Sequence, residues 1–462
     1  MNGSKVAGAA AVAILTAGLI APLAVFDEEA QRALGLTLFA VVMWTARPVP
    51  VELSSLVVLL LLPATGLLDF AATFDPFARP TIWLVFSGMV LSLMLSETGL
   101  GHRLASVAQP VLTGGGPLRL FVGLHLIGLL ASFLIPSGLV RVLLLMPIGI
   151  SLAESLSPVR GERSPAATAA ITLALLCSTY YGGCGILTGS VPNLVVTGQL
   201  EAETGRVIYW GEWLVWMFPV FGALRTALCL GVVYFVMGRG LATELGAQDR
   251  SVNAPLEPAQ RRALAIIAIG IALWATDVVH GLPPVYVGLL LCVLAVLPGW
   301  GPLSMERIRG IDFPFFFYLS ALFGIGEVLH ATGVNDRLLG HVLSVLDFET
   351  SGGWLFQHLA LTLAVIPLNF FMDVAAVGAV VTPTILQVGS AHGVSELGAL
   401  FSTAMATTLV FLPYQAAPFM VALGYRAFSM RALVSLMLLI SLISLILLCP
   451  FNITYWHWLG LI

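Results

Sequence analysis

The sequence predicts an all-α integral membrane protein built from two copies of one unit. The chain has 462 residues, of which 59% are hydrophobic and only 10% are charged, and its mean hydropathy is +1.00. Many of its apolar runs are long enough to span a bilayer. Residues 86–105 return as residues 319–339, with Thr98-Gly99 and Arg103 each 234 residues before Thr332-Gly333 and Arg337. The run ending at Pro147 matches the run ending at Pro383, 236 residues later. Internal repeats of this kind are typical of secondary transporters.

The first half reads as a series of membrane helices, some of them interrupted. A first helix covers about residues 6–26, a second ends at Arg47-Pro48, and a third covers about residues 51–68. Residues 79–105 predict a re-entrant hairpin, because an apolar arm is followed by a return arm that is polar and too short to span. The remaining apolar runs lie at residues 118–156, 166–200 and 210–238, and the first two of these are broken.

A polar segment divides the chain, and the second half repeats the plan of the first. Residues 239–262 are rich in arginine and favour a cytoplasmic loop. The expected divisions are an N-terminal transmembrane helix (1–30), a first repeat (31–238), this linker (239–262) and a second repeat (263–462). The second repeat has apolar runs at 263–279 and 285–297, a hairpin at 312–337, broken spans at 354–389 and 396–424, and a last helix at 431–449. About five crossings in each half is an odd number, so the copies are expected in opposite orientations, as in alternating-access carriers.

Four interruptions predict unwound backbone at membrane depth. They lie at residues 136–138, 182–193, 369–373 and 413–418. An unpaired backbone group in hydrocarbon costs several kcal/mol, so such backbone needs polar partners. One interpretation is that Gly and Pro merely kink the helices. The other is that half-helices offer N–H groups to an anion and free carbonyls to a small cation. The matching positions of the breaks favour the second interpretation.

The interrupted segments resemble those of the divalent anion:sodium symporters. That family has a segment similar to GGxGTLxGTPPN, and this chain has GGCGILTGSVPN at 182–193; residues 44–66 and 97–105 also match, and the likeness runs from about residue 34 to 450. The resemblance implies about eleven transmembrane helices with two re-entrant hairpins, a homodimeric scaffold and a transport domain that moves as an elevator. It also implies a multi-pass protein of the bacterial inner (plasma) membrane, a sulfate or dicarboxylate solute, and Na⁺ as the coupling ion.

The chain departs from this family at the two hairpin tips. Where the family has Ser-Asn-Thr, this chain has Ser137-Gly138-Leu139 and Asp373-Val374-Ala375. The final Pro-Asn of the second loop is Pro418-Phe419, so Asn193 alone keeps the family asparagine. In the family these side chains hydrogen-bond the substrate carboxylate and help to bind sodium. The resemblance therefore does not transfer the dicarboxylate or the sodium site intact.

Two charged residues replace the missing polar side chains. Arg141 lies four residues after Ser137, so the two share one helix face. An arginine at membrane depth costs about 2.5–3.5 kcal/mol on insertion scales, and we expect it to have an anionic partner. Asp373 is the counterpart of Ser137 and suits a helix N-cap. Arg141 and Asp373 can neutralise each other across the repeats, Arg141 can attract an anionic solute, or Asp373 can titrate and couple transport to protons.

These features predict a secondary transporter of small anions, with a dicarboxylate or sulfate-like oxyanion as the leading solute through the resemblance alone. The alternative is a proton-coupled or exchange carrier of a different small solute, with Asp373 as the titrating switch and no sodium. An enzyme is not expected, because neither HExxH nor GxSxG occurs, and the single lysine, Lys5, leaves no polybasic patch for nucleic acid. The expected partners are a small anion, the lipid bilayer and a second copy of the chain.

The residues expected to bind ligands lie in the interrupted segments. For the solute they are Ser137, Gly138, Arg141, Thr188, Ser190, Asn193, Asp373 and Gln415. For sodium, the one expected cofactor-like ion, they are Ser137, Gly183, Asn193 and Asn369. The first half keeps more of the family pattern, so we expect at most one well-formed sodium site, between Ser137 and the 182–193 loop.

Overall fold

The computed structural model describes most of the chain. The described residues are 10, 12–14, 16, 27–46, 48–100, 103, 116–135, 137–155, 164–239, 241, 255–311, 313–334, 337, 353–370 and 373–462. The helix expected at residues 6–26 lies almost wholly outside this set, as does Pro136 of the first tip. Within it, all regular structure is helical, which confirms the all-α prediction.

The first half consists of helices that are interrupted at two places. They are α2 (Glu28–Ala46), α3 (Val51–Ala64), α4 (Phe70–Phe74), α5 (Pro80–Glu97), α7 (Gly116–Leu134), α8 (Gly138–Ser155), α9 (Pro165–Gly183), α10 (Val191–Thr204), α11 (Trp210–Met217) and α12 (Arg225–Val233). Short 3₁₀ turns cover Asp75–Ala78 and Leu187–Gly189, and π-helical turns cover Phe218–Leu224 and Tyr234–Gly238.

The second half has the same succession of elements. Its helices are α13 (Pro258–Ala275), α14 (Asp277–His280), α15 (Pro284–Val296), α16 (Met305–Ile308), α17 (Phe315–Ala331), α19 (Trp354–Asn369), α20 (Val374–Ala391), α21 (Glu396–Thr408), α22 (Ala417–Gly424), α23 (Met430–Ile443) and α24 (Cys449–Trp458). A 3₁₀ turn covers Pro413–Gln415 and a π-helical turn covers Ser444–Leu448.

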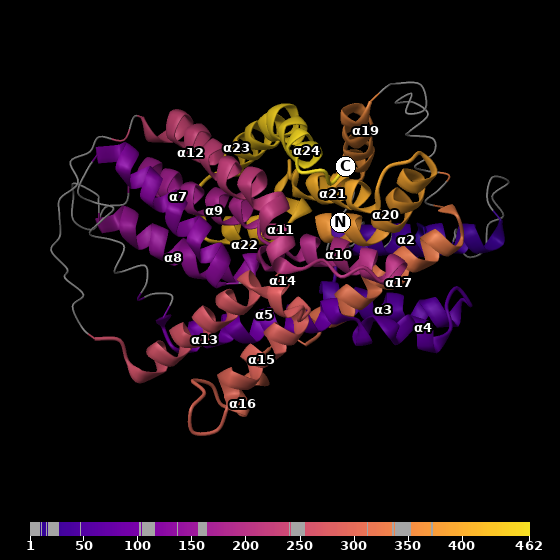
Figure 1. The fold of residues 1–462 in the computed structure, drawn as a ribbon, viewed down its shortest axis with the longest axis horizontal. Helices are drawn as coiled ribbons and strands as arrows, with labels where there is room; N and C mark the ends of the chain where they lie inside the picture. Colours follow the sequence, from indigo (N-terminus) through magenta and orange to yellow (C-terminus); the bar gives the residue numbers. More distant parts are fainter. Residues whose placement is uncertain are drawn as a thin grey trace.

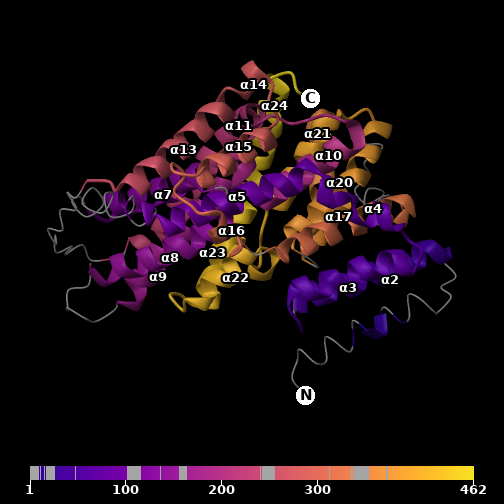
Figure 2. The same ribbon diagram turned by 90° about the horizontal axis from the view of Figure 1, so that it is seen from below.

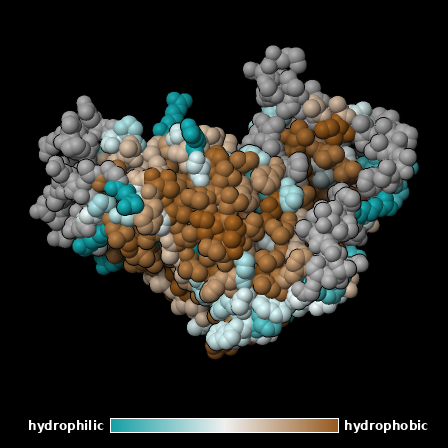
Figure 3. Space-filling model, turned by 90° about the horizontal axis from the view of Figure 1, so that it is seen from above, coloured by the Kyte–Doolittle hydropathy of each residue, from teal (hydrophilic) through white to brown (hydrophobic). Residues whose placement is uncertain are grey.

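The helices have the length and apolar surface of a membrane protein. Among the described residues, five continuous helical stretches are long and apolar enough to cross a bilayer: 80–97, 116–134, 210–238, 374–391 and 430–458. Large apolar side chains such as Leu60, Phe235 and Ile446 are exposed, and Figure 3 shows a broad hydrophobic face. Exposed apolar area of this extent is expected where a protein faces lipid.

The first arms of the expected re-entrant hairpins at 79–105 and 312–337 are continuous helices. Helix α5 is unbroken over 18 residues, a length of about 27 Å that can cross a bilayer. Helix α17 is likewise unbroken over 17 residues. Each helix ends in a turn at a glycine with positive φ, Gly99 and Gly333. The return arms lie outside the described residues except for Arg103 and Arg337.

The predicted breaks lie at matching points of the two halves. Helices α7 and α8 are separated at residues 135–137, and α19 and α20 at residues 370–373. After α9 and α21 comes a 3₁₀ turn, and the residue that precedes the next helix has nearly the same backbone angles in each half: φ −147°, ψ 131° at Ser190 and φ −148°, ψ 125° at Ala416. The last stretch of each half, 210–238 and 430–458, is 29 residues long and contains a π-helical turn.

The two halves interlock rather than pack as separate domains. Helix α5 packs against α15, and α3 packs against α17. Helices of opposite halves also pair near the breaks, where α8 packs against α22 and α10 packs against α20. Figures 1 and 2 show these segments, far apart in sequence, lying side by side. The crossed packing brings the broken segments of both halves into one region of the molecule.

Candidate functional site

Glycines shape the break between α9 and α10. A Cβ on Gly185 would lie 2.5 Å from the backbone N and Cα of Gly222, in the π-helical turn. A Cβ on Gly189 would lie 2.4 Å from the carbonyl oxygen of Gly183. Backbone atoms cannot move away as a flexible side chain can, so only glycine fits at these two positions. The glycine-rich stretch read from the sequence therefore allows the chain to fold closely on itself.

Arg141 lies at the centre of the first-half break. Its backbone N donates to Ser137 O at 3.0 Å, which places it in the first turn of α8, as predicted. The side chain is 1% exposed. Its Nε donates to Thr179 Oγ1 at 2.9 Å, Nη1 to Ile135 O at 2.8 Å, and Nη2 to Thr179 O at 3.1 Å and to Gly189 O at 2.7 Å. The guanidinium thus joins the end of α7, the last turns of α9 and the 3₁₀ turn.

These oxygens are uncharged, which corrects the expectation that Arg141 has an anionic partner. Among the described residues, no ion pair includes Arg141, and none joins it to Asp373. The carbonyls of Ile135, Thr179 and Gly189 lie at or near C-terminal ends of helical segments, where the backbone dipoles are negative. The carbonyls at these helix ends supply partial negative charge to Arg141 in place of the expected anionic partner.

The other predicted residues of the first half hold the loop together. Asn193 donates through Nδ2 to Cys184 O at 3.0 Å and to Ile186 O at 2.9 Å, while its buried Oδ1 has no hydrogen-bond partner among the described residues. Thr188 accepts a hydrogen bond from the indole of Trp210 at 3.2 Å. Ser190 precedes α10 without a capping hydrogen bond from its side chain. Ser137 Oγ accepts from Val140 N at 3.4 Å at the start of α8.

Amide side chains perform the same task in the second half. Asn369 donates through Nδ2 to Ala406 O at 2.8 Å and to Leu409 O at 3.2 Å, and its buried Oδ1 has no partner within the part of the chain that the structure describes. Gln415 donates to Asn369 O at 2.5 Å and accepts from the backbone N–H groups of residues 411 and 412. Asp373 caps α20 by accepting from Ala375 N at 2.8 Å.

The two breaks meet through aromatic and backbone contacts. A Cβ on Gly138, in the first tip, would lie 3.4 Å from the ring of Pro418, at the start of α22. The rings of Tyr180 and Phe419 pack in a tilted arrangement with their centroids 4.4 Å apart. The structure therefore brings the first tip and the first loop against the second loop.

Arg225 is a central residue that we did not single out from the sequence. It is fully buried, donates to Thr408 O at 2.9 Å at the end of α21, and lies over the rings of Tyr181 and Phe221 at 4.6 and 5.2 Å. Its Nε and Nη1 have no hydrogen-bond partner within the described part of the chain. The sequence could have identified Arg225, because an arginine inside an apolar run such as 210–238 marks a functional position by default.

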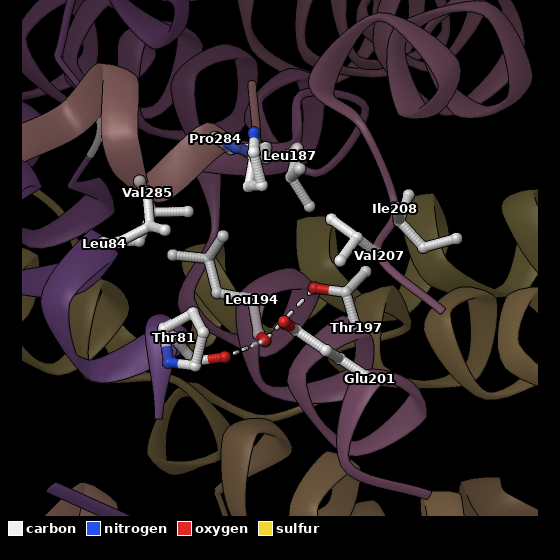
Figure 4. Close-up of a pocket in the computed structure, with 12 residues that line it drawn as sticks. Thr81, Leu84, Leu187, Leu194, Thr197, Glu201, Val207, Ile208, Pro284 and Val285 are labelled. Carbon is white, nitrogen blue, oxygen red and sulfur yellow. Dashed lines mark hydrogen bonds between the residues drawn. The ribbon is translucent and has the colours of Figure 1, made fainter. Parts of the chain in front are cut away.

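A crevice lies beside the first loop, between α10 and the N-terminal ends of α5 and α15 (Figure 4). It has about 40 Å³ of water-accessible volume. Its wall carries Leu187, the hydroxyls of Thr81 and Thr197, and the carboxylate of Glu201. The hydroxyls of Thr81 and Thr197 donate to Leu194 O at 3.4 and 3.2 Å, respectively. None of the predicted binding residues lines it.

Comparison with known proteins identifies the family. A family model described as "Sodium:sulfate symporter transmembrane region" matches residues 5–462. The chain belongs to this family. The match confirms the resemblance to the divalent anion:sodium symporters. The members of this family are transporters, so the protein is a multi-pass membrane transporter and not an enzyme.

Similar proteins cover nearly the whole chain at low identity. A "Membrane protein" of Cupriavidus necator is 25% identical over 96% of this chain and 91% of that protein. A "Sodium-dependent dicarboxylate transporter SdcS" of Staphylococcus saprophyticus is 22% identical over 91% of this chain and 85% of that protein. The crystal structure of the Alcanivorax borkumensis YdaH transporter has a TM-score of 0.55 and 17% identity, covering 84% of this chain and 88% of that one. This structural likeness supports the fold.

Proposed function

We propose that the protein is a secondary active transporter that moves a small dicarboxylate or sulfate-like oxyanion together with a cation. Family membership supports secondary transport of anions, and a dicarboxylate transporter is among the relatives. The observation that carries the proposal is the positive charge of Arg141, which lies buried at the shared break and makes its hydrogen bonds to uncharged oxygens.

The solute is proposed to bind at the first tip. The N-terminus of α8 presents N–H groups that have no partner within the helix, and its dipole favours an anion. Gly138 carries no side chain to block approach to this backbone, and Ser137 adds a hydroxyl. The guanidinium of Arg141 has five N–H donors, of which four serve the protein oxygens described above. Arg141 therefore attracts the anion mainly through its charge.

The second tip is unsuited to a second anion. The carboxylate of Asp373 already accepts from the first turn of α20, which satisfies the preference of that helix end for negative charge. One solute is therefore proposed for each chain, at the tip that has no acidic cap. An ionised Asp373 near a dianion is repulsive, and this supports the alternative in which a protonated Asp373 accompanies the solute and replaces sodium.

A sodium ion has candidate oxygen ligands in each half. The buried Oδ1 atoms of Asn193 and Asn369 accept no hydrogen bond from any residue that the structure describes, and both side chains lie where backbone carbonyls converge. In the first half, however, the carbonyls of Thr179 and Gly189 already accept from Arg141, and a guanidinium beside the site repels a second cation. We propose that Asn369, one of the four sodium ligands expected from the sequence, is the more suitable ligand, whereas the sequence had favoured a site between Ser137 and the 182–193 loop.

The transport movement is proposed to be an elevator. We divide the chain according to the helix pairs that join the two halves. The proposed scaffold consists of α2, α3, α5, α13, α15 and α17, and the proposed moving unit consists of α7–α12 and α19–α24. Each contains helices from both halves. The moving unit holds all predicted ligand residues. A homodimer assembled through the scaffold helices follows from the family resemblance.

Uptake by reconstituted protein tests the proposal. Proteoliposomes would be given labelled succinate or labelled sulfate, with Na⁺ and pH gradients imposed separately. We expect saturable uptake of one anion driven by one cation gradient, together with counterflow. Uptake driven by the pH gradient alone favours the alternative with Asp373. Uptake of neither anion with either gradient would contradict the proposed function, and flux without counterflow would identify a channel.

A further inference from the structure

The environment of Arg141 has the composition of a cation site. Backbone carbonyls of Ile135, Thr179 and Gly189 converge from three separate segments on one positively charged group, together with the hydroxyl of Thr179. Carbonyl and hydroxyl oxygens are the ligands that small hard cations use in proteins. A buried guanidinium more commonly pairs with a carboxylate, so a cage of neutral oxygens is an unusual setting for arginine.

The surrounding chain is shaped to hold the guanidinium. A Cβ on Gly183 would lie 2.5 Å from Arg141 Nη2 and 3.3 Å from Cζ. Any side chain at this position would displace the guanidinium from the carbonyls that it binds. Ser132 also donates to Thr179 O at 3.0 Å and thereby fixes one of those carbonyls. The absence of a side chain at Gly183 is thus a second, independent sign that the cage is built for Arg141.

The equivalent point of the second half is arranged differently. Carbonyls at the end of α21 accept from the neutral amide of Asn369 at residues 406 and 409, and the neighbouring carbonyl of residue 408 accepts from a single nitrogen of Arg225. Asn369 keeps a buried oxygen that receives no hydrogen bond from the described residues. Among the described residues, Arg141 occupies three carbonyls in the first half whereas Arg225 occupies one in the second, so the two halves differ in their capacity to bind a free cation.

We propose that Arg141 is a tethered cation that occupies the place of one coupling ion, so that the first half of this transporter binds no Na⁺. The inference rests on the proposed function, because it concerns the number of ions that accompany the solute. The charge that a diffusible ion would bring and release stays covalently attached and moves with the transport unit. Sodium coupling, where it operates, then involves the second half alone, with at most one Na⁺ for each chain.

Equilibrium binding of ²²Na⁺ to the purified protein tests this inference without measuring transport. We expect the wild-type chain to bind no more than one Na⁺. Binding of two Na⁺ ions by the wild-type chain would overturn the proposal, whether or not any variant folds. If the liposomes take up no anion but the protein still binds one Na⁺ or none, the result would count against the proposed function and not against the tethered-cation role of Arg141.

Variants of Arg141 locate the effect. Arg141→Ala removes the guanidinium and leaves the carbonyl cage open, so we expect the protein to bind one additional Na⁺. We also expect Na⁺ to raise the Tm of this variant and choline to leave it unchanged. Arg141→Lys keeps a tethered charge and serves as the matched control, with stoichiometry unchanged. A monodisperse Arg141→Ala protein that binds no additional Na⁺ would show that the cage is structural and would refute the tethered-cation role.

Discussion

Two buried arginines stabilise the broken backbone through carbonyl oxygens. Arg141 binds carbonyls of the first break and Arg225 binds the carbonyl of Thr408 in the second. Hydrogen bonds from charged donors contribute about 1.5–3 kcal/mol each, so the four bonds of Arg141 offset much of the cost of burying its charge. Because these oxygens carry only partial negative charge, the positive charge of Arg141 is not fully neutralised, and its field extends to whatever binds at the nearby tip.

Asp373 combines a structural role with a charge, and substitution separates the two. Asparagine is as good an N-cap as aspartate, so Asp373→Asn is expected to unfold at the same temperature as the wild type. Asp373→Ala loses the bond to Ala375 N and is expected to lose about 0.5–2 kcal/mol of stability, measured by thermal unfolding in detergent. Equal stability of both variants would show that the cap contributes nothing. Uptake by Asp373→Asn that keeps its full pH dependence would remove Asp373 as the proton switch.

At the scale of elements, the breaks were predictable from the sequence but their partners were not. Glycine and proline marked the interruptions at 136–138, 182–193 and 413–418, because these residues weaken helices locally. The interruption at 369–373 was expected as the repeat counterpart of the first. The donors that satisfy the unwound carbonyls come from distant positions: Arg141 lies 48 residues from Gly189, Arg225 lies 183 residues from Thr408, and Tyr181, which donates to Val410 O, lies 229 residues away. Arg225 and Tyr181 reach acceptors in the second half through the crossed packing of the halves, whereas Arg141 reaches Gly189 through packing within the first half. No local sequence pattern encodes either arrangement.

The close approach of the first loop to the π-helical turn makes a prediction about Gly185. Gly185→Ala forces a Cβ against the backbone of Gly222, and such overpacking typically costs about 1–3 kcal/mol. Gly231→Ala in α12 is the matched control, because a Cβ there meets nothing within 4 Å and alanine in a helix is favoured by about 0.5–1 kcal/mol. We expect Tm to fall for the first variant and to stay or rise for the second. A Gly185→Ala protein as stable as the control would contradict the packing described for the loop.

For the whole molecule, the exchanged helix pairs define where movement is possible. The crevice of Figure 4 lies between α10, assigned to the moving unit, and α5 and α15, assigned to the scaffold. Residues on either side of this boundary touch: a Cβ on Gly198 of α10 would lie 3.1 Å from Cβ of Thr81 of α5. Within the scaffold, a Cβ on Gly288 of α15 would lie 2.9 Å from Cβ of Ser87 of α5. Both separations come within about 1 Å of the Cβ distance in disulfides.

These two contacts allow a direct test of the elevator. In a Thr81→Cys/Gly198→Cys protein, oxidation would fix α10 to the scaffold, and we expect solute uptake to fall by at least about tenfold and to recover on reduction, because rigid-body displacement is blocked. A Ser87→Cys/Gly288→Cys protein carries its crosslink within the scaffold and is expected to keep its uptake under the same oxidation. The five native cysteines are buried and free, so the oxidised wild type provides the baseline. Full uptake by a completely crosslinked 81–198 protein would mean that α10 does not move against α5 and that transport uses a different motion.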